Sequence, residues 1–271
     1  MRILHVWDQA ATASVIAKWQ KKIGHTTTVI KNAKHDKAGM TKYYGGILVK
    51  NKYYFILKAT LMARNYDVIH LHDAWFMVVP LKLLYRNKKI VLHYHGSLIR
   101  DKHIDSYRAK LESLVDLILV STPDLLEYDY QKQPYYLPNP IDTDLFKQRK
   151  PQTNNRCFTS LKAETKSKEI DKYLTKDFDY EFQENVKGYA TAIPYEKFHE
   201  KLEQYEYYAD IPFIKGKLIP THSVCGLQAL NMGLGVLRWD GALEYGLPSF
   251  HKPESVVKEL DKFYQSVFQK Q

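Results

Sequence analysis

Four histidines lie at the ends of two short apolar runs in the first half of the chain: His70, His72, His93 and His95. An imidazole can donate or accept a hydrogen bond and can carry a proton near neutral pH, so these positions are candidates for acid–base or binding chemistry. Gly96 follows and lets the chain turn sharply. Residues two apart in a strand share a face, so a histidine there can also serve only as packing. No carboxylate or cysteine accompanies the four at a metal-ligand spacing, so we expect no metal.

A second candidate is the turn between the first apolar run and the first predicted helix. In a doubly wound parallel sheet such a turn lies at the carboxyl edge, where a helix N-terminus offers backbone N–H groups to an anion. The dinucleotide-binding fingerprint G-x-G-x-x-G is absent, so a tight turn without a ligand is the alternative interpretation. The turn consists of small residues: Ala10, Ala11, Thr12, Ala13 and Ser14.

Two lysines and one glutamine stand out in the second half. Lys162 and Lys166 follow a predicted strand at a spacing of i, i+4, which places both ammonium groups on one side of a helix start. That arrangement suits a diphosphate, although such a pair is also typical of a solvated helix face. Gln228 lies in an otherwise apolar predicted helix, where its amide needs a partner, either the backbone or a ligand hydroxyl.

The elements that must position these residues alternate between short apolar runs and amphipathic segments. This alternation is typical of βαβ units and predicts an α/β fold with a parallel sheet. In the first half we expect strands over 2–7, 26–30, 68–72, 90–94 and 117–121, and helices over 13–23, 53–64, 75–85 and 106–114.

A domain boundary is expected near residue 147, because 133–140 holds three prolines and 147–155 is polar without a hydrophobic period. The second half is more charged and predicts a reduced Rossmann unit of about four strands. There we expect strands over 157–161, 180–184, 211–214 and 236–239, and helices over 167–174, 195–207, 224–232 and 254–268.

The composition is that of a globular chain: 271 residues, 45% hydrophobic and 26% charged. The two cysteines, Cys157 and Cys225, lie far apart and match no metal-ligand spacing, so we expect reduced thiols. The apolar run at 2–7 is too short for a signal peptide, and no run approaches the roughly 18 residues of a membrane span. We therefore expect a cytoplasmic protein, soluble or peripheral to a membrane.

The net charge of +10 attracts polyanions. No helix-turn-helix, zinc-finger or RNA-binding aromatic motif accompanies it, so we expect no nucleic-acid partner. Basic and aromatic residues alternate between 50 and 89, which suits peripheral association with an anionic membrane at its inner face. A charged exterior around an aromatic core is the alternative. The residues are Lys50, Lys52, Lys58, Arg64, Lys82, Arg86, Lys88 and Lys89, with Tyr53, Tyr54, Phe55, Trp75, Phe76 and Tyr85.

Several segments resemble, in order along the chain, retaining GT-B glycosyltransferases of glycosyltransferase family four, the glycosyl group-1 transferases. These segments are IGHTTTVI (23–30), HYHGSLIR (93–100), LVDLILVSTPDLLEY (114–128), YLPNPIDTDLF (136–146) and VCGLQALNMGLGVL (224–237). The resemblance implies a GT-B fold, two Rossmann-like domains with a central cleft, the C-terminal one reduced. It implies an acceptor-side domain over 1–147, a donor-nucleotide domain over 148–252, and a C-terminal helix over 253–271 that can pack back on the first domain.

By position, the resemblance makes His95 the catalytic side chain, in contact with the transferred sugar or its phosphate. Residues 10–14 would border the acceptor and the donor phosphates. Lys162 and Lys166 would hold the donor diphosphate in place of a metal ion, and Gln228 would bind the nucleotide ribose. The donor-binding residues implied in this way are Gly96, Ser97, Lys162, Lys166, Ser223, Val224 and Gln228.

The implied reaction is a metal-independent transfer of a sugar, with retention at the anomeric carbon, from a nucleotide-sugar donor to a glycan, lipid-linked or small-molecule acceptor. No cofactor is implied. The chain departs from the family pattern at E-x7-E, where Pro220 and Gln228 stand in place of the glutamates, and at Leu98, which replaces an aspartate. Residues 221–223 replace the glycines of G-F-G. A catalytically inactive GT-B-like binding or scaffold protein is therefore the alternative.

Overall fold

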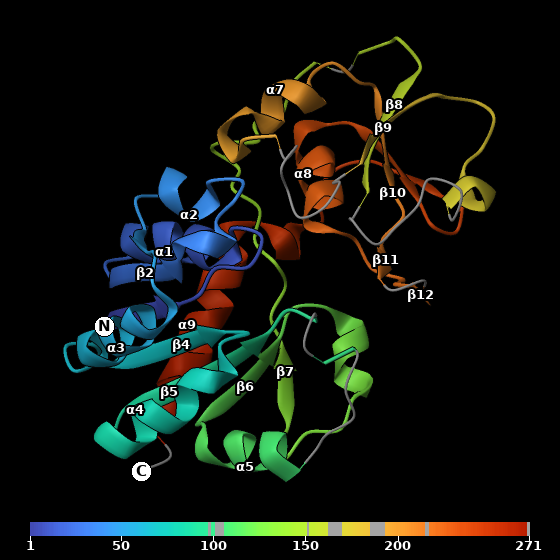
Figure 1. Cartoon of the computed structure of the whole chain (residues 1–271). Coiled ribbons are helices and arrows are strands. Elements are labelled where there is room, and N and C mark those ends of the chain that lie inside the picture. Colours follow the sequence, from blue (N-terminus) through green and yellow to red (C-terminus); the bar gives the residue numbers. More distant parts are fainter. Residues whose placement is uncertain are drawn as a thin grey trace. The chain divides into compact units, whose positions relative to one another are not determined.

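The computed structural model divides the chain into two compact units (Figure 1). Unit 1 comprises Met1–Asp36, Met40–Pro140 and Pro253–Gln271, and unit 2 comprises Lys37–Gly39 and Ile141–Lys252. The chain thus leaves unit 1 before the boundary expected near residue 147. The structure describes residues 1–96, 99–100, 106–150, 152–161, 170–184, 193–214 and 217–269.

The early division has a local cause within unit 2. The Ile141 N–H donates to the His251 carbonyl at 3.2 Å. The buried ring of Phe146 packs edge-on against Tyr195, with ring centroids 5.9 Å apart. The segment after Pro140 therefore belongs to the core of unit 2, although its sequence gives little sign of this.

Unit 1 is built on a seven-stranded parallel sheet of order β3-β2-β1-β4-β5-β6-β7. The central strands are rich in β-branched and apolar residues and are buried on both faces, as expected when helices cover a parallel sheet. The sequence predicted all but the short strands β3 and β7. The strands are β1 (Arg2–Val6), β2 (Thr26–Asn32), β3 (Ile47–Val49), β4 (Val68–His72), β5 (Lys89–Tyr94), β6 (Leu117–Val120) and β7 (Pro134–Tyr136).

The predicted helices of unit 1 begin and end close to the expected positions, whereas the short helix α2 was not predicted. Asn51 caps α3, accepting the Tyr54 N–H at 2.9 Å. The helix predicted over 75–85 divides into a 3-10 turn and α4, and Pro80 sits in the first turn of α4, where its missing N–H costs little. The elements are α1 (Thr12–Lys22), α2 (Met40–Tyr43), α3 (Lys52–Ala63), α4 (Val78–Leu84), α5 (Ser106–Leu114), α9 (Pro253–Gln269), and 3-10 turns η1 (Ala33–His35), η2 (Trp75–Met77) and η3 (Pro123–Glu127).

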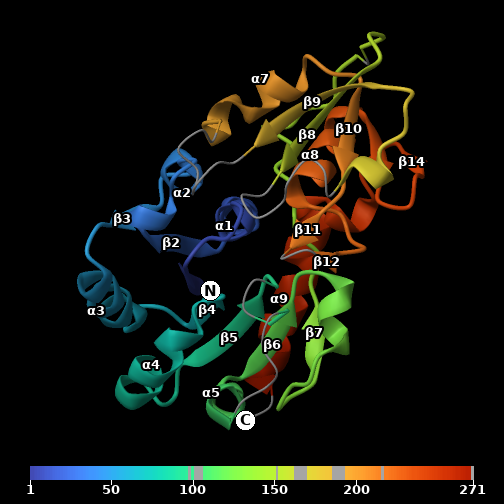
Figure 2. The same ribbon diagram turned by 45° about the vertical axis from the view of Figure 1, so that its right-hand side comes forward.

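The closing helix α9 belongs to unit 1, where it packs beside α1 and against the sheet (Figure 2). Its buried residues recur at helical spacing. One of them, Tyr264, reaches His70 on β4, the hydroxyl lying 2.7 Å from Nδ1. The apolar stripe of this amphipathic segment is therefore part of the unit 1 core.

Unit 2 is a smaller α/β unit with a five-stranded sheet of order β14-β13-β10-β8-β9. The strands pair in parallel except for the short antiparallel edge strand β14. The elements are β8 (Arg156–Leu161), β9 (Asp179–Glu184), β10 (Tyr207–Asp210), β11 (Phe213–Ile214), β12 (Lys217–Leu218), β13 (Gly235–Arg238), β14 (Leu243–Glu244), α7 (Phe198–Leu202), α8 (Val224–Met232), and 3-10 turns η4 (Asp171–Tyr173), η5 (Tyr195–Lys197) and η6 (Ser249–His251).

Two predictions for unit 2 are wrong. The helix predicted over 195–207 ends at Leu202, and Tyr207 already belongs to β10, the central strand that the sequence analysis missed. The predicted strand over 211–214 is only β11, one arm of a hairpin. The run QYEYYAD (204–210) before β11 contains charged and aromatic residues that fit helical and strand periods equally well. Of the helix predicted over 167–174, residues 167–169 lie outside the described residues.

Candidate functional site

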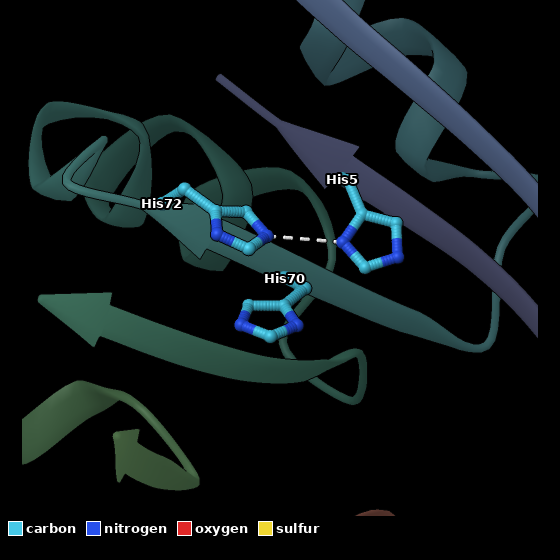
Figure 3. A group of neighbouring side chains, drawn as sticks. All are labelled: His5, His70 and His72. Atoms are coloured by element: carbon cyan, nitrogen blue, oxygen red, sulfur yellow. Dashed lines mark hydrogen bonds between the residues drawn. The ribbon is translucent and has the colours of Figure 1, made fainter. Parts of the chain in front are cut away.

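Five histidines lie on one face of three neighbouring strands in unit 1. The parallel register sets His5 on β1 beside His70 on β4, and His72 beside His93 on β5. These four side chains are 0% exposed, whereas His95, just after β5, is partly exposed. Figure 3 shows the rings of His5, His70 and His72 close together above the strands. The fold brings the four predicted histidines together and adds His5, which the sequence analysis did not single out.

Hydrogen bonds join three of these rings into a chain. His5 Nδ1 lies 3.0 Å from His72 Nε2, the bond drawn in Figure 3. His72 Nδ1 lies 3.0 Å from His95 Nε2. The two ends of the chain meet amides: His5 Nε2 lies 2.8 Å from Gln20 Oε1 on α1, and Asn139 hydrogen-bonds to His95. The chain therefore runs from the carboxyl edge of the sheet into the core.

His70 and His93 form a separate branch. His70 Nδ1 lies 2.7 Å from the Tyr264 hydroxyl, and His70 Nε2 lies 3.3 Å from His93 Nδ1. His93 Nε2 is buried without a hydrogen-bond partner among the described residues. This branch ends inside the core, so the packing interpretation fits it better than a catalytic one.

Burial keeps the histidines of this cluster neutral. It lowers the pKa of His5 to about 4 and that of His95 to about 3. For His70, His72 and His93, burial and then the neighbouring imidazoles hold the pKa well below 6.5. A neutral imidazole offers one donor and one acceptor, which is what a hydrogen-bonded chain needs.

The turn before α1 is held by a buried carboxylate. Asp8 Oδ1 accepts the N–H groups of Ala13 at 3.0 Å and Ser14 at 3.3 Å. Asp8 Oδ2 accepts the hydroxyls of Ser14 at 2.5 Å and Thr41 at 3.0 Å. Burial raises the pKa of Asp8, although Lys31 and these hydrogen bonds oppose the shift. The expectation that this helix start offers free N–H groups to an anion is wrong at Ala13 and Ser14, because Asp8 already occupies the anion position.

The rest of the predicted turn is buried or strained. Ala10 and Ala11 have φ of 49° and 64°, in the left-handed region that non-glycine residues rarely adopt. Trp7 and Asp73 share this conformation, with φ of 75° and 54°. The Thr12 hydroxyl donates to Asn139 Oδ1 at 3.3 Å. Strained backbone gathered at one sheet edge is a frequent mark of a functional site.

Backbone and side-chain contacts also fix the turn after β5. The His95 N–H donates to Asp73 Oδ1 at 3.0 Å. Gly96 has φ of +96°, and a Cβ there would lie 2.1 Å from Arg100 Nη1. Arg100 in turn donates two hydrogen bonds to Asp124, at 2.8 and 3.0 Å. The positive φ therefore favours glycine at 96, while Ser97 lies outside the described residues.

In unit 2 a polar network gathers where β10 ends and α8 begins. Ser223 caps α8, its hydroxyl accepting the Gly226 N–H at 3.0 Å. Asp210 Oδ2 accepts the Ser223 N–H at 3.0 Å and lies 2.9 Å from His222 Nδ1. His222 Nε2 lies 2.8 Å from Glu244 Oε2. Burial lowers the pKa of His222, but hydrogen bonds and charge from Asp210 and Glu244 outweigh it and raise the pKa overall.

The other predicted donor-binding residues divide into described and undescribed ones. Val224 is the first residue of α8, and Gln228, one turn later, is buried. Ser223 lies beside the end of β10, at the carboxyl edge of the unit 2 sheet. Lys162 and Lys166 lie outside the described residues.

Two overlapping groups of three histidines in unit 1 could hold a metal ion, since their ligand atoms lie within 4.8 Å of one another. Both groups include His72 and draw on the cluster described above. Neutral imidazoles without carboxylate or thiolate suit zinc, copper or nickel better than magnesium or calcium.

A second surface lies on α3 and α4, which pack side by side. Tyr53 is 79% and Leu83 73% exposed, so large apolar groups face solvent on both helices. Phe55 is buried and Trp75 and Phe76 pack on the core, as the alternative of an aromatic core predicted. We call the following residues the apolar-basic surface: Tyr53, Tyr54, Leu57, Leu61, Leu83 and Leu84, with exposed Lys50, Lys52, Arg64 and Arg86. Among the helices of the described residues, none is long and apolar enough to cross a membrane.

Several residues of these networks were not predicted. Asp8 and Asp73 each follow a strand closely at the carboxyl edge, and this position was the available signal. Asn139 stood in the segment YLPNPIDTDLF without being assigned a role. Asp210 and His222 could not be recognised, because β10 itself was missed.

Two solved structures share the fold of this chain. An α-glucosyltransferase solved with UDP-glucose and DNA containing an abasic site aligns with 100% of this chain and 92% of its own, at 11% identity and a TM-score of 0.56. The UDP-GlcNAc 2-epimerase from Methanocaldococcus jannaschii aligns with 97% of this chain and 100% of its own, at 10% identity and a TM-score of 0.50. No protein-family model and no curated protein matches the sequence.

These similarities confirm the predicted fold class. The chain has an α/β GT-B fold with two Rossmann-like units, of which the second has the smaller sheet. At such low identity the similarity concerns the fold, and activity has to be argued from the sites.

Proposed function

We propose that the chain is a glycosyltransferase that moves a sugar from a nucleotide-sugar donor to a hydroxyl acceptor. The observation that carries the proposal is the joint occurrence of this fold and a histidine chain ending at His95 on the carboxyl edge of the unit 1 sheet. In open α/β sheets, ligands bind outside the carboxyl ends of the strands. The strained residues of the same edge support this location.

Each unit has its own task in this proposal. Unit 2 binds the donor, with Gln228 on the ribose and with Lys162 and Lys166 on the diphosphate in place of a metal ion. In this proposal the sugar is transferred with retention at the anomeric carbon. Unit 1 supplies His95, which contacts the transferred sugar as a neutral hydrogen-bonding group because burial keeps its pKa low. Residues 10–14 border the acceptor.

The position of Asp8 narrows where the diphosphate can bind. Its carboxylate already holds the N–H groups of Ala13 and Ser14, and a second anion there would meet charge repulsion. We therefore assign the diphosphate to Lys162, Lys166 and the start of α8, and leave the turn of unit 1 to the acceptor.

Substitution at the two proposed contacts tests the reaction. His95→Ala and Lys166→Ala should each lower transfer or donor hydrolysis at least tenfold, since a lost transition-state or phosphate contact costs on the order of 2–4 kcal/mol. His25→Ala is the matched control, because His25 pairs with Asp261 away from the histidine chain. Full activity in both test variants contradicts the assignment.

The departures at Pro220 and Gln228 support a second candidate, a GT-B-like binding or scaffold protein without activity. Titration calorimetry with uridine, guanosine and adenosine diphosphate sugars separates the two candidates. Binding of one donor, weakened at least tenfold by Gln228→Ala, favours the enzyme. Binding of none favours the scaffold.

We propose further that the apolar-basic surface holds the protein on the inner face of an anionic membrane. Exposed leucines and tyrosines can enter the headgroup region while lysines and arginines meet anionic lipid. Co-sedimentation with phosphatidylglycerol-containing vesicles should fall at least fivefold for Leu83→Ser with Leu84→Ser. Leu243→Ser, at an exposed leucine of unit 2, is the control. Equal sedimentation of all variants refutes the proposed role of the apolar-basic surface in membrane binding.

No nucleic-acid partner is expected. A filter-binding assay with DNA and RNA should therefore show no salt-sensitive affinity.

A further inference from the structure

The histidine chain of unit 1 has the geometry of paired hydrogen bonds rather than of a metal site. Three imidazoles on a zinc ion direct one nitrogen each at a common point about 2.0–2.1 Å away. Here both nitrogens of His72 are matched separately, one with His5 and one with His95, each at 3.0 Å. The partners lie on opposite sides of the His72 ring, so the nitrogens form a line.

The direction in which each hydrogen bond is donated follows from Gln20, at the inner end of the histidine chain. Gln20 Oε1 can only accept, so His5 Nε2 carries the proton in the 2.8 Å bond between them. A neutral imidazole has a single N–H, so His5 Nδ1 accepts and His72 Nε2 donates. By the same reasoning His72 Nδ1 accepts from His95 Nε2–H. His95 is left with its lone pair on Nδ1.

We propose that His72 and His5 are positioning residues that, anchored by Gln20, hold His95 in the tautomer with the proton on Nε2 and the lone pair on Nδ1. The inference rests on the proposed function, in which His95 contacts the reacting sugar. It assigns a task to buried histidines that touch no substrate.

The surroundings of His95 explain why its tautomer needs support from the core. The His95 N–H is held by Asp73, and Asn139 hydrogen-bonds to the side chain. The hydrogen bond to Asn139 raises the pKa of His95, as an accepting partner does, so Asn139 does not by itself hold the proton on Nε2. The inner partner, His72, favours the proton on Nε2, and its own tautomer depends on His5 and Gln20. In a buried, low-dielectric chain each bond also strengthens the next.

Nitrogen NMR on the full chain with 15N-labelled histidine tests the proposal directly, because protonated and unprotonated ring nitrogens differ in chemical shift. At pH 7.5 we expect His5, His72 and His95 each to carry the proton on Nε2 alone. Single substitutions assign the signals, and His25→Gln should remove one set of signals without shifting the three.

Substitution of Gln20 provides a second test. In Gln20→Met the acceptor is lost at similar volume, so His5, His72 and His95 should show mixed tautomers. The kcat of transfer should fall about threefold to tenfold while the KM for the donor changes less than twofold. Thr27→Val is the matched control: it removes a buried hydrogen bond of 3.0 Å to the Ala17 carbonyl of α1 without touching the histidines. Thr27→Val should leave the tautomers of all three histidines and the kcat unchanged.

Three results overturn the inference. One is a proton on Nδ1 of His72 or His95 in the unaltered protein, and another is a single unchanged tautomer of His95 in Gln20→Met. The third is a stoichiometric zinc, copper or nickel ion in the purified protein whose removal by a chelator shifts the histidine signals. Expected tautomers in a protein that transfers no sugar refute the proposed function alone.

Discussion

Acid should unfold unit 1 through its buried histidines. His5, His70, His72 and His93 are fully buried, and each has its pKa lowered by burial before any other cause. In the unfolded chain each returns to a pKa near 6.5. Between pH 6.5 and the lowered values, the unfolded state therefore binds more protons than the folded state. Their contribution to stability is present above pH 6.5 and is lost as the pH falls.

The magnitude follows from proton linkage. At pH 5 an unfolded histidine gains about 2 kcal/mol from protonation that a folded, neutral one does not. The four fully buried residues give about 8 kcal/mol, comparable with the 5–15 kcal/mol that keeps a typical domain folded. His95, whose pKa is lowered to about 3, adds to this loss. The charged and polar groups that face these rings are Lys21, Gln20, Tyr264 and His95. The positive charge of Lys21 lowers the pKa of His5 further.

Urea unfolding, followed by tryptophan fluorescence and circular dichroism at several pH values and constant ionic strength, measures the effect. Below pH 5.5 we expect the free energy of unfolding to fall by at least about 5 kcal/mol per pH unit, because the four fully buried histidines contribute about 1.36 kcal/mol each and His95 adds to them. His93→Leu should reduce this slope by about a quarter. Leu92→Ala, which alters a buried neighbour on β5, should lower stability at every pH without changing the slope. A free energy that stays within about 1 kcal/mol between pH 6.5 and 5 would falsify the reasoning.

Three further predictions concern single contacts. Gly96→Ala should lower the free energy of unfolding by about 2 kcal/mol or more, because the new Cβ meets the Arg100 guanidinium at a φ of +96°; an unchanged melting temperature contradicts this. Asp8→Ala should cost about 2–4 kcal/mol in urea unfolding, since it strands buried N–H donors, and Asp8→Asn, which keeps an acceptor, should cost less. Glu244→Gln should lower the pKa of His222 in an NMR titration, because it removes a charge that raises it. The raised pKa of His222 stabilises the fold below pH 6.5, and this stabilisation is lost as the pH rises through the pKa of His222 in the folded protein. In Glu244→Gln the stabilisation should therefore be lost at a lower pH. An unchanged titration of His222 argues against its pairing with Glu244.

Local patterns in the sequence were sufficient for most elements of unit 1. The strand β6 is a continuous apolar run, and helices such as α1 and α9 carry a 3.6-residue period, so neighbouring residues alone indicate them. The helix α8 was predicted with the same bounds, because Gly233 ends it at a φ of +90°. The central strand β10 was missed, because its tyrosine-rich, charged run has no distinctive period.

The sequence also indicated that histidines gather at the strand ends, because strand position sets which edge a residue occupies. It could not show that His5 lies between Gln20 and His72, since these contacts join residues from α1, β1 and β4 through strand order and register. Nor could it show that Asp8 fills the helix start that an anion was expected to occupy. Residue types and spacing determine which chemistry a chain can offer; only the tertiary structure decides which polar groups satisfy one another, because hydrogen bonds act over about 3 Å in space and not along the sequence.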